Sequence, residues 1–469
     1  MNFMQKSAAI SVIRTLREHG HEAYLVGGCV RDLLLGREPA DYDVSTDATP
    51  REVMRIFPET YAVGEQFGVV LVPIDGLTAR DLEHAAQEEE QQDQTVGEAA
   101  RHNAIEVATF RSDGLYSDGR HPDEVRFSKT AEEDVQRRDF TINGLLLDPL
   151  NNDAVLDYVG GRSDLDAGII RTIGDPERRF TEDKLRMLRA IRFASRFEYR
   201  IDPTTFSAIQ RLAPEIHQVS RERIREELTK MLTEGHARRA FELLDQSGLL
   251  HEVLPEIERM KGVEQPPEYH PEGDVFVHTM MLLEQLPSDA SRTLAWGALL
   301  HDVGKPATFR VAPDRIRFDG HVEVGEAMAR DICQRLRMSN DDTEQIVALV
   351  HNHMKFADAM KMKESTLKRF LRLPQFPEHL ALHRLDCLAS HANLSLYDFV
   401  SKKMAETPAA EIRPEPLVRG DDLIALGHAP GPLFREILSA VEDQQLEGSL
   451  TTREAALEFV RENFPAHAT

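Results

Sequence analysis

Cysteine, tryptophan and long apolar runs are scarce in this sequence of 469 residues. The three cysteines, Cys29, Cys333 and Cys387, lie far apart and form no CxxC motif, which argues against a disulfide scaffold or a zinc ribbon and predicts a reducing, cytoplasmic environment. No run of about 18 apolar residues is present, so we expect no transmembrane helix and no membrane partner. The N-terminal stretch is charged and amphipathic, so a secretory signal is not expected either.

Positive charge is also in short supply. The chain has 56 Lys and Arg against 80 Asp and Glu, a formal net charge of −24, and this balance alone argues against a nucleic-acid partner. The charge is unevenly distributed, however. Residues 80–101 carry seven acids between two flanking arginines and are predicted to form a solvated helix or a disordered insert. Residues 171–200 carry nine Lys and Arg against five acids, a local excess of +4.

Two kinds of hydrophobic pattern divide the chain. Up to residue 150, short apolar runs alternate with helical patterns, and we predict strands at residues 23–26, 42–44, 69–74 and 105–110. Beyond residue 150 the pattern is helical almost throughout. The head patterns fit an α/β or an α+β fold with a modest sheet. The fold class that we predict is α+β, with four parts: a head with a small mixed sheet at 1–150, a helical neck and body at 151–262, a histidine-rich helical domain at 263–405 and a helical tail at 406–469.

Several acids in the head suit a metal site. Asp41 and Asp43 follow a glycine pair at 27–28, which ends the first predicted strand and opens a helix where a phosphate can approach the backbone. Residues i and i+2 of a strand point to the same face, and two adjacent carboxylates repel each other unless a cation lies between them. Such a pair can hold Mg²⁺ beside a triphosphate, with Glu106 as a third carboxylate. Each feature has an alternative interpretation. The glycine pair can form a simple strand-to-helix turn, Asp41 and Asp43 can be solvated loop acids, and Glu106 can be a surface acid of its strand.

Charged residues in two later segments suit a nucleotide site. Arg138 can clamp a phosphate or ribose, with Asp139 holding it in place, or the two can form an exposed ion pair at a helix start. Asp183, Arg186 and Arg189 are spaced i, i+3 and i+6, which predicts one stripe of a helix. The alternative for this stripe is a charged face exposed to solvent.

Five motifs in order resemble one family. They are GGCVRD (27–32), DYD (41–43), FRSDGLYSDGRHP (110–122), RRDFTING (137–144) and GDPERRFTEDKLRMLRAIRFA (174–194). Together they resemble the class II tRNA nucleotidyltransferases, the CCA-adding enzymes of the polymerase-β-like superfamily. The resemblance covers about the first half of the chain. It departs from the family pattern only at Gly144, where alanine is usual.

The resemblance implies a role for each matching residue. It implies that Asp41 and Asp43 bind the catalytic Mg²⁺. Glu106, on a neighbouring predicted strand, is expected to join them as a third catalytic carboxylate. It also implies a set of nucleotide-binding residues, which are Gly28, Arg31, Arg138, Asp139, Asp183, Arg186 and Arg189. A flexible loop at about 112–127 takes part in the change from C to A addition in this family.

The chemistry of Asp183 and Arg186 fits selection of C and A. A carboxylate only accepts hydrogen bonds, and a guanidinium only donates them. Cytosine and adenine each present an amine beside an acceptor, whereas uracil and guanine place a carbonyl where the amine belongs. A mismatched contact costs about 1–3 kcal/mol, so two side chains suffice to reject U and G without a nucleic-acid template.

The histidine-rich part resembles the HD phosphohydrolase superfamily. His278 lies 23 residues before His301-Asp302, and Asp386 lies 84 residues after Asp302. Imidazole and carboxylate ligands suit Mn²⁺, Fe²⁺, Ni²⁺, Co²⁺ or Mg²⁺. Two-metal members carry extra histidines where this chain has His321 and His353, with His351 as a rival for the second place. The alternative is a set of satisfied helix histidines.

The resemblances together predict a tRNA nucleotidyltransferase that adds C and A from CTP and ATP to the tRNA 3′ end and that also has an HD phosphohydrolase activity. The open alternatives are a CC-adding or A-adding enzyme, a poly(A) polymerase, an RNA-end phosphodiesterase with an RNA-binding head, and a non-catalytic RNA-binding protein. RNA is expected along residues 171–200 and the basic residues that follow, which are Arg221, Arg223, Arg225, Lys230, Arg238 and Arg239.

Overall fold

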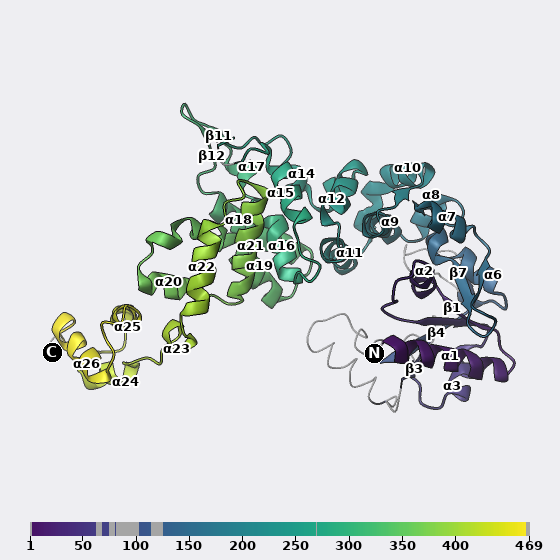
Figure 1. Ribbon diagram of the computed structural model, residues 1–469, viewed down its shortest axis with the longest axis horizontal. Coiled ribbons are helices and arrows are strands. Elements are labelled where there is room, and N and C mark those ends of the chain that lie inside the picture. Colours follow the sequence, from purple (N-terminus) through teal and green to yellow (C-terminus); the bar gives the residue numbers. More distant parts are fainter. Residues whose placement is uncertain are drawn as a thin grey trace. The chain divides into compact units, whose positions relative to one another are not determined.

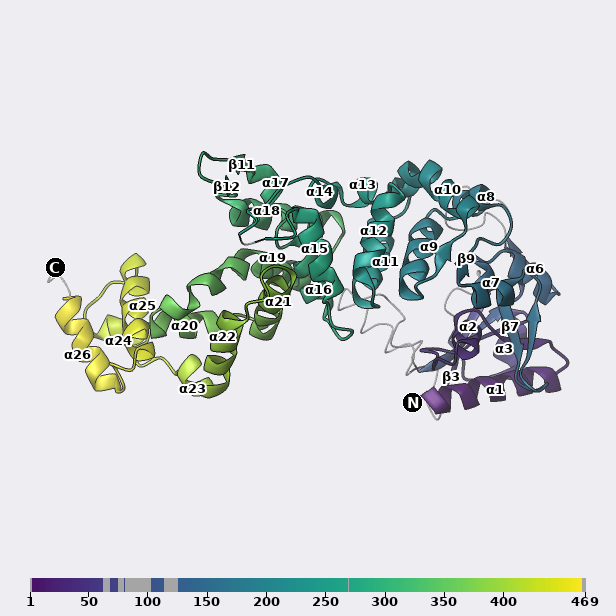
Figure 2. The same cartoon turned by 45° about the horizontal axis from the view of Figure 1, so that its top comes forward.

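The computed structural model describes residues 2–61, 68–74, 80, 103–113, 125–268 and 270–465. The chain divides into two compact units, Met1–Glu258 and Arg259–Thr469, and each is described by itself (Figures 1 and 2). Except for Arg80, the acidic insert at 80–101 lies outside the described residues, as does most of the loop at 112–127.

A six-stranded mixed sheet forms the centre of the first unit, with the strand order β3-β4-β2-β1-β7-β8. Its strands are β1 (Ala23–Val26), β2 (Asp43–Thr46), β3 (Val69–Pro73), β4 (Ala104–Thr109), β7 (Leu145–Asp148) and β8 (Ala154–Asp157). Only β2 and β4 run parallel; the other neighbours are antiparallel. The mixed sheet and the α+β fold class are as predicted. The strands β7 and β8 were not predicted, because β7 is buried at every position and lacks the alternation that identifies a strand.

Helices cover this sheet and continue into the neck. The helix α1 (Asn2–Glu18) buries Ala9, Val12, Ile13 and Leu16, the i, i+3, i+4, i+7 spacing of one helix face. The other helices of the first unit are α2 (Gly28–Leu34), α3 (Pro50–Ile56), α6 (Ala131–Gln136), α7 (Gly161–Ala167), α8 (Pro176–Glu182), α9 (Leu185–Arg196), α10 (Pro203–Leu212), α11 (Arg221–Thr233), α12 (Ala237–Gln246), α13 (Leu249–Val253) and α14 (Pro255–Glu258). Short elements complete it: β5 (Arg111–Asp113), β6 (Val125–Phe127), β9 (Ile169–Ile170), β10 (Arg200–Ile201), η2 (Thr141–Asn143) and η3 (Ala213–Gln218).

The break between α8 and α9 corrects one expectation. Asp183 was expected to share a helical stripe with Arg186 and Arg189. It instead ends α8 in an extended conformation, with φ −148° and ψ 105°. Its carboxylate accepts the backbone N–H of Leu185 at 3.0 Å, which stabilises the start of α9.

The second unit is helical and contains one small hairpin. Its helices are α15 (Val275–Glu284), α16 (Arg292–Leu300), α17 (Lys305–Thr308), α18 (His321–Arg335), α19 (Asn340–Asn352), η4 (His353–Lys361), α20 (Glu364–Leu371), α21 (Phe376–Ala389), α22 (Ser395–Glu406), α23 (Ala409–Ile412), α24 (Gly420–Ala425), α25 (Pro432–Leu446) and α26 (Arg453–Asn463). The hairpin consists of β11 (Arg310–Val311) and β12 (Ile316–Arg317). In the part of the chain that the structure describes, no helix is long and apolar enough to cross a membrane.

Candidate nucleotide and metal sites

The head carboxylates lie at the start of β2 and in β4. Asp43 is the register partner of Glu106 in the parallel pair, so the two side chains point to the same side of the sheet. Both line a cavity of about 210 Å³ together with Arg111, Arg137 and Arg138. The structure therefore brings one of the two expected aspartates beside the third expected carboxylate and beside cations that suit phosphate.

Asp41 differs from the expectation in one respect. It lies two residues before β2 and is exposed, so it is not part of the strand on which both acids were expected. Tyr42 between the two acids is buried, whereas Asp41 and Asp43 are exposed and partly exposed. The burial pattern still alternates along Asp41–Asp43, and both acids remain accessible to an ion. Among the described residues, however, the groups whose ligand atoms all lie within 4.8 Å of one another are in the second unit.

Arg138 is positioned by Asp134, which sequence reasoning missed. Its Nη2 donates to Asp134 Oδ2 at 2.9 Å, and Arg137 donates to the other carboxylate oxygen at 2.7 Å. Burial raises the pKa of Asp134, but the two guanidinium groups outweigh it and lower that pKa. Gly27 has φ +76°, and a Cβ there would approach Arg138 Nη1 to 3.3 Å. The first glycine of the pair thus leaves room for an arginine side chain.

Arg31 is buried and has partners of its own. Its Nε donates to Asp32 Oδ1 at 2.8 Å and its Nη1 donates to Asn143 Oδ1 at 2.7 Å. The guanidinium lies 4.6 Å from the ring centroid of Phe197. Arg31 therefore ties the helix after the glycine turn to the RRDFTING segment and to α9. The role of Gly28 and Arg31 in nucleotide binding stays a prediction.

Asp139 holds Arg189, not Arg138 as expected. Arg189 Nε and Nη2 donate to Asp139 Oδ2 at 2.9 and 2.8 Å, and Asn143 donates to Oδ1 at 3.1 Å. Burial raises the pKa of Asp139, but Arg189 and Asn143 outweigh burial and lower it to about 2. The carboxylate is ionised at neutral pH, and its bonds join the head to the neck helix α9.

Asp183 and Arg186 also have intramolecular partners. Arg223, from α11, donates to Asp183 Oδ2 at 2.9 Å and to Oδ1 at 3.3 Å. Arg186 donates to Glu182 at 3.0 Å and to the backbone carbonyls of residues 179 and 137, each at 3.1 Å. A base that reads this acceptor and donor has to share or replace these bonds. Arg223 lies 40 residues from Asp183 in sequence, so no local sequence pattern predicted this ion pair.

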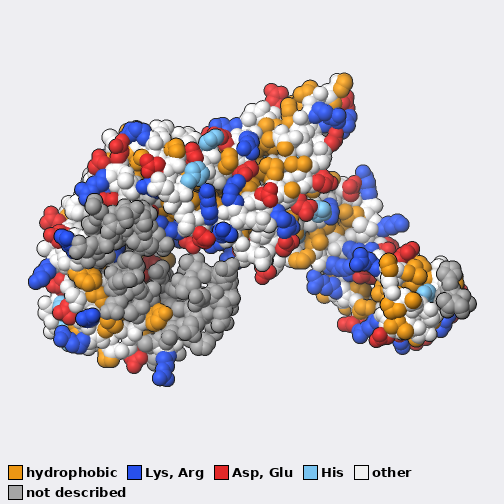
Figure 3. Space-filling model, turned by 180° about the vertical axis from the view of Figure 1, so that it is seen from behind, with side chains coloured by type: hydrophobic (Ala, Val, Ile, Leu, Met, Phe, Trp, Pro, Cys, Tyr) orange, Lys and Arg blue, Asp and Glu red, His pale blue; other side chains and the backbone are white. Residues whose placement is uncertain are grey.

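The expected basic track is partly neutralised by neighbouring acids. Arg192 donates to Glu227 at 2.7 Å, Arg179 to Glu182 at 2.7 Å, and Arg223 to Asp183. Figure 3 shows Lys and Arg side chains interspersed with Asp and Glu over the face in view. The local excess of +4 along residues 171–200 is thus used in part to hold the neck helices together.

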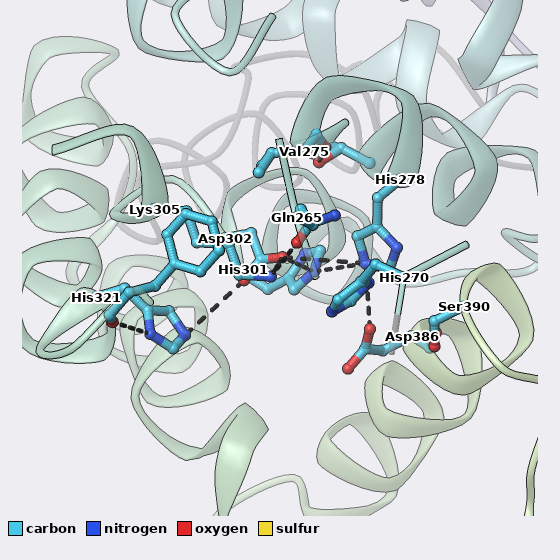
Figure 4. Close-up of polar contacts among 12 residues, drawn as sticks. Gln265, His270, Val275, His278, His301, Asp302, Lys305, His321, Asp386 and Ser390 are labelled. Carbon is cyan, nitrogen blue, oxygen red and sulfur yellow. Dashed lines mark hydrogen bonds and ion pairs between the residues drawn. The ribbon is translucent and has the colours of Figure 1, made fainter. Parts of the chain in front are cut away.

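The expected His–Asp residues meet in the second unit (Figure 4). His278 Nε2, from α15, lies 3.1 Å from Asp386 Oδ1, from α21, and 3.3 Å from His301 Nε2 at the end of α16. His301 Nε2 lies 3.2 Å from Asp302 Oδ2. Four side chains from three helix segments thus converge although up to 108 residues separate them. We refer to these four residues as the His–Asp cluster.

Two further histidines face the other oxygen of Asp302. His321 Nε2 and His353 Nε2 lie 3.9 and 3.7 Å from Asp302 Oδ1. Their Nδ1 atoms donate to backbone carbonyls at 2.9 and 2.6 Å, which leaves a lone pair on each Nε2. Both Nε2 atoms are buried, and neither has a hydrogen-bond partner among the residues that the structure describes. Lone pairs that face a carboxylate oxygen repel it, and a cation between them removes the repulsion. These residues therefore fit a divalent metal.

His351 is not part of this arrangement. Its Nδ1 donates to Glu326 Oε2 at 2.8 Å, and its side chain is 44% exposed. His353, two residues later, begins η4 and turns its imidazole inward. Of the two rivals, His353 is therefore the one that lies at Asp302.

A set of supporting residues around the cluster was not predicted. Glu272 Oε1 accepts from His278 Nδ1 at 2.7 Å and from His270 Nδ1 at 2.9 Å. Burial raises the pKa of Glu272, but these two bonds outweigh it and lower the pKa to about 2. Lys305 Nζ donates to Asp302 Oδ2 at 2.7 Å and to Gln265 at 2.6 Å. Three of them, His270, Glu272 and Lys305, lie within eight positions of His278 or Asp302, so their closeness in sequence could have identified them. Gln265 lies farther away in sequence.

Hydrogen bonds set the charge of His278. Burial lowers its pKa, but the bonds to Asp386 and Glu272 outweigh burial and raise the pKa to about 9. His353 lacks such a carboxylate contact at bonding distance, and burial lowers its pKa to about 4. Because Glu272 accepts from Nδ1, the Nε2 atom of His278 is the one that faces the cluster.

Three family models match consecutive parts of this chain. The poly A polymerase head domain matches residues 23–86 and 75–171. The probable RNA and SrmB-binding site of polymerase A matches residues 198–261, and the HD domain matches residues 269–390. The matches follow one another in the order of the predicted head, neck and histidine-rich domain.

Proteins similar to this chain over part or most of its length are CCA-adding enzymes. The one from Geobacillus stearothermophilus is 41% identical over 241 residues, 51% of this chain and 53% of that protein, so the alignment spans about half of the relative's length. The one from Enterococcus faecalis is 31% identical over 451 residues, 96% of this chain and 94% of that protein. The crystal structure of the Bacillus stearothermophilus CCA-adding enzyme in complex with CTP is similar with a TM-score of 0.71 and 26% identity, covering 97% of this chain and 98% of that one.

Proposed function

Because the chain belongs to the family of the CCA-adding enzymes, we propose that it adds C and A from CTP and ATP to the tRNA 3′ end, with Mg²⁺ and without a nucleic-acid template. The observation that carries the proposal is the similarity to the Enterococcus faecalis CCA-adding enzyme over 96% of this chain, because that range includes head, neck and helical domains. It supports CCA addition over a poly(A) polymerase and over a non-catalytic RNA-binding protein.

In this proposal the head residues bind and orient the triphosphate. Asp41, Asp43 and Glu106 would hold Mg²⁺, which when bound stabilises the attacking and leaving oxygens of the transfer. Arg138, fixed by Asp134, would neutralise the triphosphate. The RNA 3′-hydroxyl attacks the α-phosphate, and pyrophosphate leaves. Correct placement of the two substrates supplies a large part of the acceleration.

In this proposal, Asp183 and Arg186 select the base of the incoming nucleotide. The Asp183 carboxylate would accept the amine of cytosine or adenine, and Arg186 would donate to the neighbouring ring acceptor. The hydrogen bonds from Arg223 orient this carboxylate before the base arrives. Uracil and guanine present a carbonyl to Asp183 and lose this contact. The position of these side chains in one unit with Asp43 and Glu106 supports the assignment.

An incorporation assay tests the transferase proposal. A tRNA that lacks its terminal CCA is incubated with labelled CTP and ATP in the presence of Mg²⁺, and the product is sequenced. Addition of C, C and A is expected. Products that stop at CC, or that form only on tRNA ending in CC, would assign the chain to the CC-adding or A-adding relatives. Long oligo(A) tails would identify a poly(A) polymerase.

A second function is supported by the His–Asp cluster: hydrolysis of a phosphomonoester or cyclic phosphate at an RNA end. The supporting observation is the pair of buried, unpartnered Nε2 atoms of His321 and His353 opposite Asp302. We assign Mn²⁺, Fe²⁺, Ni²⁺, Co²⁺ or Mg²⁺ to this cluster. A bound metal supplies a nucleophilic water at neutral pH. Glu272 holds the expected ligand His278 in place, and Lys305 holds Asp302.

Metal content and ester hydrolysis test the second function. The purified protein is expected to bind a divalent metal in the second unit and to hydrolyse bis(p-nitrophenyl) phosphate. Hydrolysis that persists after replacement of both head aspartates, without any nucleotide addition by the unchanged protein, would favour the RNA-end phosphodiesterase alternative.

The cytoplasmic location is also part of the proposal and is supported by three cysteines that are all free and buried.

A further inference from the structure

The cavity at the His–Asp cluster extends well beyond the metal-ligating groups. It measures about 490 Å³, within the range of roughly 300–1,000 Å³ that is typical of sites for whole organic ligands. His321, His353 and Asp386 line one part of it, and Met354 and Leu396 add apolar surface. A phosphate bound at the cluster would leave most of this cavity for the rest of its substrate.

The β11–β12 hairpin supplies another wall of the same cavity. The two strands pair through Arg310 with Arg317 and Val311 with Ile316, and the chain then continues into α18, which begins at His321. The residues of the hairpin and its C-terminal side that line the cavity are Arg315, Ile316, Arg317, Phe318 and Asp319. The hairpin segment thus contributes two arginines and an aromatic ring to the cavity that His321 and Asp386 also line.

The arginines of this hairpin differ in their partners. Arg310 donates to Asp319 Oδ2 at 2.8 Å, and Arg317 donates to Asp314 Oδ2 at 2.7 Å. Arg315 forms no ion pair and no side-chain hydrogen bond with any residue that the structure describes. It is exposed and lines the cavity. An anion can therefore bind Arg315 without breaking an intramolecular ion pair.

We propose that Arg315 binds a second phosphate of a nucleic-acid strand whose terminal phosphate lies at the His–Asp cluster. The substrate class of this site is then the phosphorylated end of a single-stranded oligonucleotide, in preference to a mononucleotide. This inference rests on the proposed hydrolytic function. A terminal base unstacked from its neighbour would pack on Phe318 and Met354, and such packing tolerates any base.

Two matched variants test the proposal in the full-length protein. R315Q removes the unpaired guanidinium, and R310Q removes a paired one from the same hairpin that is not a cavity-lining residue. The probes are uridine 3′-monophosphate and a tri-uridylate that ends in a 3′-phosphate, each used as an inhibitor of bis(p-nitrophenyl) phosphate hydrolysis with Mn²⁺ present. In R315Q we expect the trinucleotide to inhibit about 10-fold more weakly, with unchanged inhibition by the mononucleotide. R310Q should behave as the unchanged protein does.

A second measurement does not depend on activity or metal. Hydrogen exchange of residues 309–319 is followed by mass spectrometry in EDTA, with and without the trinucleotide. Protection is expected in the unchanged protein and in R310Q, and it should be lost in R315Q. Equal behaviour of R315Q and R310Q, or a loss of mononucleotide inhibition as large as the loss for the trinucleotide, would overturn the proposal.

The outcomes also separate this inference from the proposed hydrolysis. Ester hydrolysis without a preference for the trinucleotide would refute the role of Arg315 and leave the hydrolytic function intact. Protection of 309–319 by the trinucleotide, lost in R315Q, without any ester hydrolysis would refute the hydrolytic function and leave the role of Arg315 intact.

Discussion

In the head and neck, the arginines that are expected to bind nucleotide already have acceptors. Asp134 holds Arg138, and Asp139 holds Arg189. In the second unit, by contrast, His321 and His353 turn buried lone pairs toward Asp302, and no described residue donates a hydrogen bond to them. A nucleotide that binds in the head would therefore have to share or replace existing bonds. The space between Asp302 and these two imidazoles suits a cation.

This difference has a physical origin in the chemistry of the ligands. Guanidinium and carboxylate groups are charged at neutral pH and pair with each other when no substrate is present. A neutral imidazole whose Nδ1 donates to a backbone carbonyl cannot neutralise a carboxylate. The comparison predicts that changes in the head affect addition and leave metal content intact, whereas changes in the cluster do the reverse.

The largest effect is expected for D43A. Loss of the carboxylate beside Glu106 should reduce CCA addition by about 10³-fold or more, because the electrostatic stabilisation of the transferring phosphoryl group is lost. Hydrolysis of bis(p-nitrophenyl) phosphate should not change. Single-turnover incorporation of labelled CTP measures the effect, and D166A, which alters an exposed acid of α7, is the control. A loss below 10-fold would remove Asp43 from the metal site.

D302A is expected to have the next largest effect, in the other unit. Asp302 faces three imidazoles and Lys305, so its removal should abolish stoichiometric metal binding and lower ester hydrolysis by more than about 100-fold. CCA addition should remain within about twofold. Metal analysis after dialysis provides the measurement, with D358A as the control. Full metal occupancy in D302A would contradict the ligand assignment.

E272Q tests whether metal binding in the second unit depends on a residue that only positions a ligand. Glu272 accepts a hydrogen bond from His278 Nδ1. An amide accepts more weakly than a carboxylate, so His278 should be held less firmly and metal affinity should fall by about 10- to 100-fold. Calorimetric titration with Mn²⁺ measures the change. E272D should recover part of the affinity, and E268Q, which alters a neighbouring exposed acid, should have none of the effect. Unchanged affinity in E272Q would show that the bond to His278 is dispensable.

D139N tests the head–neck connection through stability. Breaking the bonds to Arg189 should lower the free energy of unfolding by about 1.5–3 kcal/mol. The folded-state pKa of Asp139 is about 2, below the ordinary value of 3.8, so its contribution should be present above about pH 4 and lost as the pH falls toward 2. Denaturant unfolding at pH 7 and pH 3 measures both. An equal difference between D139N and the unchanged protein at both pH values would contradict the shift.

R223Q is expected to have the smallest effect. Without Arg223, Asp183 should be less firmly oriented, and discrimination against UTP and GTP should fall by about 3- to 10-fold with a smaller change in the rate with CTP. Competition between labelled CTP and UTP measures the ratio. R225Q removes a charge from the same helix and should leave the ratio unchanged. A uniform loss with all four nucleotides would indicate RNA binding or folding in place of base selection.

Periodicity and residue order predicted a large part of this protein. Four strands of the head sheet follow from local patterns, and the five ordered motifs led to the correct family. The strand β7 was missed because it is buried at every position and shows no alternation, and β8, which is partly or fully exposed at every position, shows none either. The pairing of Asp183 with Arg223 and of Asp139 with Arg189 was missed because 40 and 50 residues separate the partners.

The sequence by itself determined which chemical groups this chain carries and in what order, since ligand types and helical spacing are properties of neighbouring residues. Only the tertiary structure decided which groups meet. It put Glu106 beside Asp43 through strand register and placed His353, not His351, at Asp302. It also left Arg315 without an ion pair among the described residues. Electrostatic and hydrogen-bonding contacts act over a few ångströms of space, and distances along the chain do not reveal them.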